Sequence, residues 1–247
     1  MNRVKVGFFS MSGGSSSGDD RAYLRWHQLD HMPEQYQIPG LLQGQRWGLT
    51  PKGYAARAVE PDDLRPVRYV VQYLMTDPVQ QTLDDFVQLG RRLAEVGRFP
   101  ERVTSHLLGA FHLLDAHAAP RVLVSAEVVP FRPNRGVYVI VERQMGTDGL
   151  DRWLGWLRAE HLPELLGTPG VAGVWSFATS SLWTHPAWTA GDHRVTVCYL
   201  DGEPCAVAEQ LAPAVQRRWQ MEAPVRPLLA QPFESMMTWA WDRFNPQ

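Results

Sequence analysis

Short apolar runs alternate with longer amphipathic segments along the whole chain, and the same order of the two kinds occurs twice. Apolar runs of this length, bounded by turn residues, are typical of buried or half-buried strands. The predicted strands are Val4–Phe9, Leu41–Trp47, Val67–Met75 and Ala110–His117 in the first part, and Gly136–Val141, Val171–Phe177, His193–Leu200 and Phe233–Trp241 in the second.

Two predicted helices lie between the strands of each part, one short and one long. We expect the short helices to end before Pro33 and Pro163, because proline disfavours helix in the residue that precedes it. Aspartate is a good residue to begin such a helix, since its carboxylate accepts a free backbone N–H. The long helices are expected over residues 79–97 and 203–219, and the short ones after a cap at Asp19 or Asp20 and at Asp148 or Asp151.

The end of each short helix carries the same residues, 130 positions apart (161 minus 31). Self-similarity at a fixed spacing indicates a duplicated unit. Together with the order of elements, it predicts a βαββαβ unit, which is a ferredoxin-like arrangement. The identical pairs are Trp26 and Trp156, His31 and His161, Pro33 and Pro163, Glu34 and Glu164, Pro39 and Pro169, and Gly40 and Gly170.

We therefore predict an α+β fold of two ferredoxin-like repeats, residues 1–120 and 134–247, with residues 121–133 as a linker. A four-stranded sheet with both helices on one face leaves its other face bare, and an apolar face must be covered. The two sheets are expected to pack against each other as an intrachain pseudo-dimeric barrel with the helices outside. The linker has no counterpart after the second repeat, so it is a candidate for an added edge strand.

Composition and charge narrow the range of partners. Of the 247 residues, 45% are apolar and 20% charged, which suffices for a compact core. A net charge of -2 without a basic run argues against nucleic acid as a partner. The sequence shows no signal-peptide core and no apolar window of membrane-spanning length, so we expect a cytoplasmic protein. Cys198 and Cys205 form neither a disulfide framework nor a zinc-type cluster.

The repeated segment resembles a known family. A helix that ends in Asp or Glu, His, an apolar residue and Pro, followed six residues later by Pro-Gly and a strand, is similar to the EthD-like branch of the dimeric α+β barrel superfamily. Members are usually single-repeat chains that dimerise, so the resemblance implies a fused version. Similar proteins include cofactor-free decarboxylases, dehydratases and cyclases of polyketide or aromatic intermediates, lactone isomerases and haem-binding enzymes. The resemblance implies an activity of one of these kinds, and the fold alone does not choose among them.

One face of the first short helix is polar where a helix that packs on a sheet is normally apolar. Buried imidazoles need hydrogen-bond partners, so this face indicates a cavity between the helices and the sheet. We expect His31 to act there as a general acid or base with His27 one turn away and His161 as its counterpart, since imidazole titrates near neutrality. The expected substrate-binding side chains are Tyr23, Trp26, Trp47 and Tyr73.

Other interpretations of these residues stay open. His31 and His161 could instead fasten the helix end to a loop carbonyl. His27 and His31 also have the i, i+4 spacing of two metal ligands, but the nearby acids supply no evident third ligand, so no metal is expected. The tryptophan-rich segment Trp175–Thr189 could line an apolar ligand site, contact another subunit or pack over the barrel end.

The leading hypothesis is a small-molecule enzyme without an organic cofactor that performs proton-transfer chemistry on an apolar aromatic or polyketide-like substrate. The reactions in question are decarboxylation, dehydration, isomerisation and cyclisation. A haem-binding barrel protein is one alternative, because the resemblance includes haem-binding branches and the chain has eight histidines. A non-catalytic ligand-binding protein is another. A homodimer is compatible with all three, because a fused barrel still exposes helices and edge strands.

Overall fold

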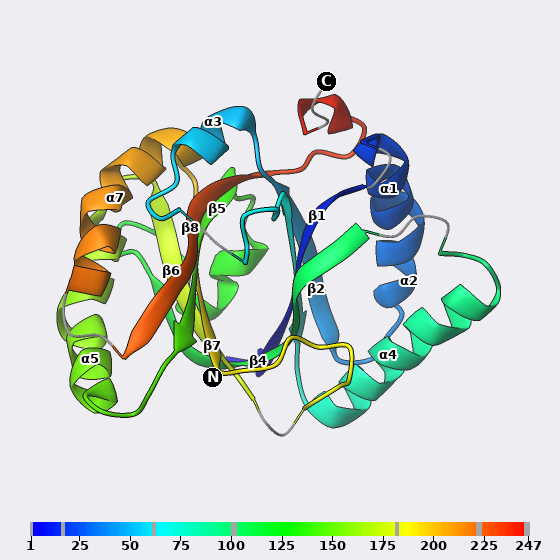
Figure 1. Ribbon diagram of the computed structural model, residues 1–247, viewed down its shortest axis with the longest axis horizontal. Helices are drawn as coiled ribbons and strands as arrows, with labels where there is room; N and C mark the ends of the chain where they lie inside the picture. Colours follow the sequence, from blue (N-terminus) through cyan, green and yellow to red (C-terminus); the bar gives the residue numbers. More distant parts are fainter. Residues whose placement is uncertain are drawn as a thin grey trace.

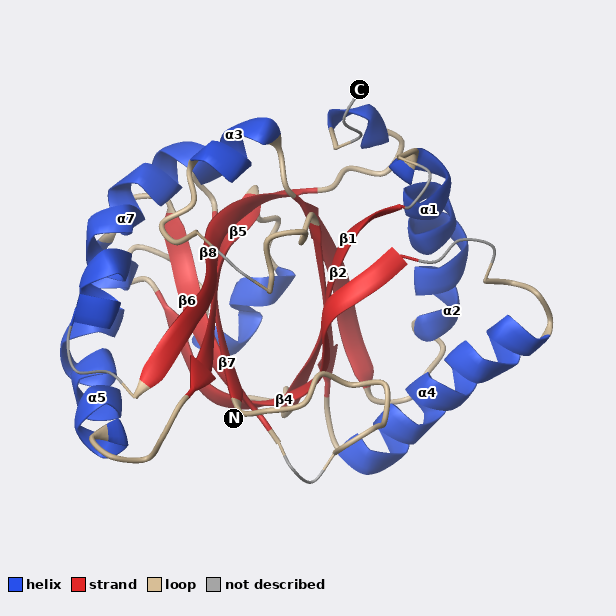
Figure 2. Cartoon of the chain, in the orientation of Figure 1, coloured by secondary structure: helices blue, strands red, loops and turns tan. Residues whose placement is uncertain are grey.

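A computed structural model of the chain describes residues 2–15, 18–60, 63–99, 103–180, 183–220 and 224–244. Within these residues eight strands form one closed barrel, and the helices lie on its outside (Figures 1 and 2). All neighbouring strands run antiparallel. The strands are β1 (Val6–Ser15), β2 (Leu41–Gly48), β3 (Tyr69–Met75), β4 (Val103–Ala118), β5 (Gly136–Gln144), β6 (Val171–Thr179), β7 (His193–Leu200) and β8 (Val225–Ser235).

Helices cover the barrel from two opposite sides, with α1, α2 and α4 on one side and α5 and α7 on the other (Figure 1). None of the described helices is both long and apolar enough to cross a membrane. The helices are α1 (Asp20–Trp26), the π-helical turn η1 (His27–His31), α2 (Met32–Gln35), α3 (Pro51–Ala55), α4 (Val79–Glu95), η2 (Ala126–Phe131), α5 (Leu150–Trp156), the π-helical turn η3 (Leu157–His161), α6 (Leu162–Gly167), α7 (Pro204–Gln220) and η4 (Trp241–Arg243).

The strand order shows how the two halves of the chain make one barrel. Around the barrel the strands follow the order β1-β3-β2-β8-β5-β7-β6-β4, so each half keeps the four-strand order of a ferredoxin-like unit. The halves join where β2 pairs with β8 and where β4 pairs with β6. At each seam the second strand of one half meets the fourth strand of the other. The predicted pseudo-dimeric α+β barrel of two ferredoxin-like units in one chain is confirmed.

The interior of the barrel is a packed apolar core that both halves share. Alternate residues of a strand face opposite sides of the sheet, so every second side chain points inward. Phe9, Met11 and Trp47 of the first half are buried there together with Trp175 and Tyr199 of the second half. The residues between them face the helices, and this outer face is where the two halves differ.

The turn into the second strand of each half requires glycine. Gly40 and Gly170 have φ values of 88° and 89°, in the left-handed region that side chains disfavour. A Cβ at Gly40 would lie 2.2 Å from the Oγ1 atom of Thr82, and one at Gly170 would lie 2.5 Å from a methyl carbon of Val207. The repeated Pro-Gly pair therefore makes the same turn against the same long helix in both halves.

The prediction that Pro33 and Pro163 end the short helices is wrong. Each helix continues through the proline, as α2 and as α6, because a π-helical turn comes directly before it. In the first half the N–H of Met32 reaches back to the carbonyl of His27, one residue further than in an α-helix. This wider turn makes room for a proline ring that would clash with a carbonyl oxygen in a regular helix.

The predicted helix caps are half right. Asp19 caps α1, and its carboxylate accepts the backbone N–H of Arg21 at 2.9 Å. The predicted cap of α5 by Asp148 or Asp151 is wrong, because that helix follows Gly149, whose φ is 74° and whose backbone makes the turn without a capping side chain.

The added edge strand considered for the linker is not formed, and the bounds predicted for the last strand are wrong. Residues 121–133 contain the short helix η2 and no strand, since β2–β8 and β4–β6 pairing already closes the barrel. The last strand ends at Ser235 rather than at Trp241. Trp241 instead packs with Tyr23 and Leu24 of α1, so its apolar character serves contact with a helix.

Candidate functional site

A cavity of about 390 Å³ lies between the helices of the first half and the outer face of its sheet. Its volume falls within the range of about 300–1,000 Å³ that is usual for small-molecule sites. Strands β1, β3 and β4 form the floor, and the α1 helix, the π-helical turn and α4 form the walls. Most of the lining is apolar, and polar side chains gather near the π-helical turn. These polar residues are Tyr23, His27, His31, Gln35 and Tyr73.

Strand pairing sets the floor of the cavity. Phe8 and Ser10 of β1 point toward the helices, and they pair with Tyr73 and Val71 of β3, which point the same way. On its other side Val71 pairs with Arg46 of β2. Arg46 is therefore the next side chain in the outward-facing row that forms the floor.

His31 is the last residue of the π-helical turn, and its ring packs in a cluster with two other aromatic rings. It stacks on Trp26 with the ring centroids 4.9 Å and the planes 16° apart, and Phe99 contacts it edge-on at 4.9 Å. Its Nε2 atom lies 3.0 Å from the side-chain nitrogen of Gln35. With this amide orientation the nitrogen donates, so Nε2 accepts and the proton of the neutral ring sits on Nδ1.

His27 lies one turn earlier, beneath the helix. Its Nε2 atom is 3.5 Å from the hydroxyl of Tyr73. Its ring centroid lies 5.5 Å from that of His31 and 5.8 Å from that of Tyr23. Two imidazoles and a phenol thus share one end of the cavity, within reach of a single bound molecule.

Burial keeps these groups uncharged at neutral pH. Burial lowers the pKa of His31 to about 4, and the positive charge of Arg46 adds to the effect. Burial also lowers the pKa of His27 well below its ordinary value, again with a contribution from Arg46. Burial raises the pKa of Tyr73 well above its ordinary value. The cavity therefore offers neutral imidazoles that can accept a proton and a neutral phenol that can donate a hydrogen bond.

Arg46 is 4% exposed, and its guanidinium lies between two aromatic rings. It is 4.6 Å from the centroid of Tyr23 and 4.9 Å from that of Tyr69. Among the described residues, none of its side-chain nitrogens has a hydrogen-bond partner, and none has a carboxylate oxygen within 4.0 Å. The buried carboxylate of Asp20 is engaged by the hydroxyl of Tyr69 and by Arg68.

The corresponding place in the second half is nearly filled. His161 stacks on Trp156 with centroids 5.1 Å and planes 21° apart, which repeats the arrangement of His31 on Trp26. The cavity beside His161 holds only about 40 Å³. Burial lowers the pKa of His161 to about 3, and Arg218 is the next contributor. The stacked histidine and tryptophan are therefore common to both halves, whereas the large cavity is found in the first.

The buried arginine of the second half is fully paired, unlike Arg46. Arg218 of α7 donates two hydrogen bonds, of 2.7 and 2.6 Å, to the carboxylate of Glu142 on β5. The indole N–H of Trp219 donates to the same carboxylate at 2.6 Å, and Arg218 also contacts the hydroxyl of Thr196 at 3.3 Å. The same helix-to-sheet layer thus contains one buried arginine with a carboxylate and one without.

The repeated glutamates connect helices rather than line the cavity. Glu34 forms an ion pair with Arg98, which follows α4, and Glu164 forms one with Arg217 of α7. Each glutamate therefore fastens the end of a short helix to the long helix beside it.

The structure brings most of the predicted site residues together. Tyr23, Trp26 and Tyr73 line the same cavity as the two histidines of the π-helical turn. Trp47 does not line it, because alternation along β2 turns its ring into the barrel interior, where it contacts Tyr199. His161 lines the small cavity of the second half.

Gln35, Arg46 and Phe99 lie at this site and were not predicted from the sequence. Gln35 lies one turn after His31 on the same helix, and this position could not be predicted while the helix was expected to end at Pro33. Arg46 had a signal, since it is a lone charge in a strand-like run next to an inward tryptophan. Phe99 had none. Trp188 belongs to the aromatic segment that was considered as a cavity wall, and it does line the cavity.

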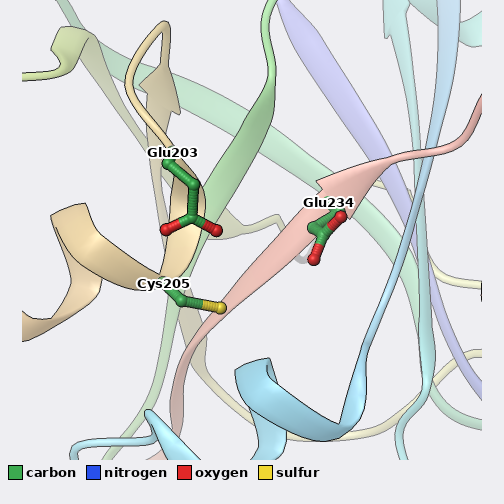
Figure 3. A group of neighbouring side chains, drawn as sticks. All are labelled: Glu203, Cys205 and Glu234. Carbon is green, nitrogen blue, oxygen red and sulfur yellow. The ribbon is translucent and has the colours of Figure 1, made fainter.

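A second group of candidate metal ligands lies in the second half, where α7 begins and β8 ends. Glu203, Cys205 and Glu234 bring ligand atoms within 4.8 Å of one another (Figure 3). Glu203 already accepts a backbone N–H of α7, and Glu234 pairs with Arg243. Burial raises the pKa of Cys205 to about 11, so its thiol stays protonated. Within the described residues, the two cavity histidines are not part of any such group.

A histidine that holds haem presents a free ring nitrogen to the iron. The Nε2 atoms of His31 and His27 face Gln35 and Tyr73 instead, and their Nδ1 atoms are closed to solvent. Both ring nitrogens of His185, at the edge of the cavity, have neighbours of their own. In this arrangement these three histidines present no free ring nitrogen to an iron, so a haem ligand at this cavity would first require the amide of Gln35 or the hydroxyl of Tyr73 to turn away.

Comparison with solved structures agrees with this architecture. An anthrone oxidase-like protein matches with a TM-score of 0.51 and 11% identity over 95% of this chain and 92% of the other. A candidate monooxygenase from Fusobacterium nucleatum matches with a TM-score of 0.50 and 11% identity over 95% and 96%. A candidate chlorite dismutase matches with a TM-score of 0.50 and 12% identity over 94% and 95%.

These structures define the class of fold. They belong to the dimeric α+β barrel superfamily, and at 11% to 12% identity the likeness shows the fold alone. This chain has that barrel, made by its own two halves. No protein-family model matches its sequence, and the search of curated proteins gives no match either.

Proposed function

We propose that the cavity of the first half is the active site of a small-molecule enzyme. The reaction is proton transfer without an organic cofactor, that is decarboxylation, dehydration, isomerisation or cyclisation, on an apolar aromatic or polyketide-like substrate. One contrast carries this proposal. The first half has about 390 Å³ beside two buried imidazoles, and the second half has about 40 Å³ at the same place.

In the proposed reaction the amide of Gln35 turns away from the Nε2 atom of His31, which then takes a proton from the substrate and returns it to another atom of the same molecule. No oxidant or reductant is consumed. His31 suits the first step because its imidazole is neutral at pH 7. Tyr73 donates a hydrogen bond that keeps His27 in one tautomer or stabilises developing negative charge. Tyr23 and Trp26 provide aromatic surface for a flat substrate.

Several finer points belong to the same proposal. The π-helical turn with its stacked histidine and tryptophan, found in both halves, supports a duplicated EthD-like unit with a boundary between residues 120 and 134. We also propose a cytoplasmic protein that associates as a homodimer, which light scattering of the purified chain would test.

The test is a screen of aromatic and polyketide-like acids and ketones, followed by a pair of matched variants. His31→Gln should lower kcat/KM on the substrate found by roughly 10²–10⁴-fold, the usual contribution of a positioned acid or base. His161→Gln removes the equivalent stacked ring from the other half and should leave kcat/KM close to that of the wild type. Thermal stability of both variants is measured in parallel.

The two variants also test the architectural alternative. If each histidine only fastens its helix, both changes should lower stability by similar amounts and affect turnover equally. A ligand recovered chemically unchanged after long incubation with the wild type would favour the non-catalytic binding protein. A visible absorption band of haem in the purified protein would contradict the cofactor-free reaction.

A further inference from the structure

Arg46 carries a buried positive charge that nothing in the described part of the chain balances at close range. Transfer of a lone ion out of water costs several kcal/mol, and buried charges are therefore usually paired. The two aromatic faces of Tyr23 and Tyr69 offset part of this cost through cation–π attraction. They leave every N–H of the guanidinium without an acceptor.

The second half contains a buried arginine that does have a counter-ion, on helix α7 where Arg46 lies on strand β2. There Arg218 is buried to a similar degree, 3% exposed, and its guanidinium is bound on two nitrogens by Glu142. Two parallel N–H···O bonds to a carboxylate are the strongest contact that arginine makes. The first half supplies the cation and, next to it, a cavity in place of a carboxylate.

The cavity adjoins Arg46 through its wall. Tyr23 lines the cavity and also contacts the guanidinium, so its ring separates the two. Val71 of the cavity floor pairs with Arg46 across neighbouring strands. A turn of the Tyr23 ring would bring the free N–H groups to the polar end of the cavity, while the rest of the lining remains apolar.

We propose that the ligand of this cavity is an aromatic carboxylate, whose ring system fills the apolar part and whose carboxylate pairs with Arg46 after the ring of Tyr23 moves aside. This rests on the proposed function of the cavity as a small-molecule site. The carboxylate of the ligand does for Arg46 what the carboxylate of Glu142 does for Arg218.

Such a ligand also explains how the buried histidines can work. Arg46 helps to keep the pKa of His31 and His27 low in the ligand-free protein. A carboxylate beside Arg46 cancels that field and raises the basicity of both rings. The base thus becomes effective when the ligand arrives.

The experiment compares two probes of the same shape by isothermal titration calorimetry at neutral pH. One is 2-naphthoate, and the other is the uncharged 2-naphthamide. We expect the wild type to bind naphthoate at least tenfold more tightly than the amide. Arg46→Met should bind the amide as the wild type does and lose the preference for naphthoate. Arg226→Met removes a half-exposed arginine of β8 and should keep the preference, which controls for net charge.

Each other outcome overturns the inference. Equal binding of the two probes by the wild type would show that the cavity accepts aromatic molecules but does not select an anion, and the proposed function would survive. A preference that persists in Arg46→Met would place the anion elsewhere. Binding of neither probe would overturn both this inference and the cavity as an aromatic site.

Discussion

Replacement of each buried arginine by methionine should change stability in opposite directions. Arg46→Met removes a charge that lacks a counter-ion, whereas Arg218→Met removes one partner of a buried pair and strands Glu142. Methionine is unbranched and apolar, and it fills the space that the aliphatic stem of arginine occupies. The two substitutions are thus chemically identical, and only the surroundings differ.

The magnitude for Arg46 follows from two opposing terms. Burial of a single ion costs several kcal/mol after relaxation, about 4–6 kcal/mol here. Each of the two cation–π contacts returns about 1–2 kcal/mol in a desolvated site. These terms leave about 0–4 kcal/mol, and we expect Arg46→Met to raise the free energy of unfolding by about 2 kcal/mol, the middle of that range. For a chain of this length, that raises Tm by roughly 4–8 °C.

Arg218→Met should lower the free energy of unfolding by about 3–5 kcal/mol, the usual cost of breaking a buried ion pair. The assay is equilibrium unfolding in urea with calorimetric Tm for the wild type and both variants, without added ligand. A loss of more than about 1 kcal/mol in Arg46→Met would refute the reasoning. It would mean that Arg46 stabilises the fold through a partner in the protein itself and that its charge is not left unpaired for a ligand.

Three more predictions concern pH, the repeated turn and the seams between the halves. Stability should decrease as pH falls from about 6.5 toward 4. In the folded protein His31 and His161 stay neutral over this range, because their pKa values are about 4 and about 3, whereas the same histidines in the unfolded chain take up protons below about pH 6.5. Urea unfolding of His31→Gln across this range should show a weaker pH dependence than that of the wild type. Arg46 and His27 face the same ring and remain in the variant. Equal slopes in the two proteins would contradict a lowered pKa of His31. Gly40→Ala should lower stability by roughly 1–3 kcal/mol, because the backbone at Gly40 is left-handed and a Cβ there would meet Thr82. Gly155→Ala lies in an exposed part of α5 with open space around it and should raise stability by up to about 1 kcal/mol. Calorimetry of both variants checks the two signs. Residues 1–120 and 134–247 produced together should form a one-to-one complex with the circular dichroism of the intact chain, because pairing of β2 with β8 and of β4 with β6 completes the barrel. A stably folded monomer of either half alone would argue against a barrel that needs both halves.

The fold could be predicted because its signals are local and repeated. Alternating apolar runs and two amphipathic helices per half determine the strand order, and the bare sheet faces leave few ways to be covered. The ends of elements were harder to predict. Pro33 stops a regular helix, yet a π-helical turn lets it pass, and no residue pattern in Trp26–Met32 announces such a turn. The apolar residues near Trp241 look like a strand but contact α1 instead.

The site was predictable only in part, for a related reason. His27, His31 and Tyr23 lie on one helix face, so their spacing alone brings them together. Gln35 depends on the helix continuing past the proline. The lack of a counter-ion at Arg46 cannot be predicted from its position in the sequence, because it depends on which carboxylates the fold brings near. The buried carboxylate of Asp20 is bound by Arg68 and Tyr69 instead.

The cavity lies on the outer face of the same strands whose inner face builds the barrel core. Phe8 and Ser10 border the ligand space while Phe9 and Met11 hold the two halves together. The residues that line the cavity and those that build the barrel core therefore alternate along one strand. A mutational library confined to outward positions of β1 and β3 could change what the protein accepts while the scaffold stays intact, and the nearly filled second half would serve as an unchanged internal reference.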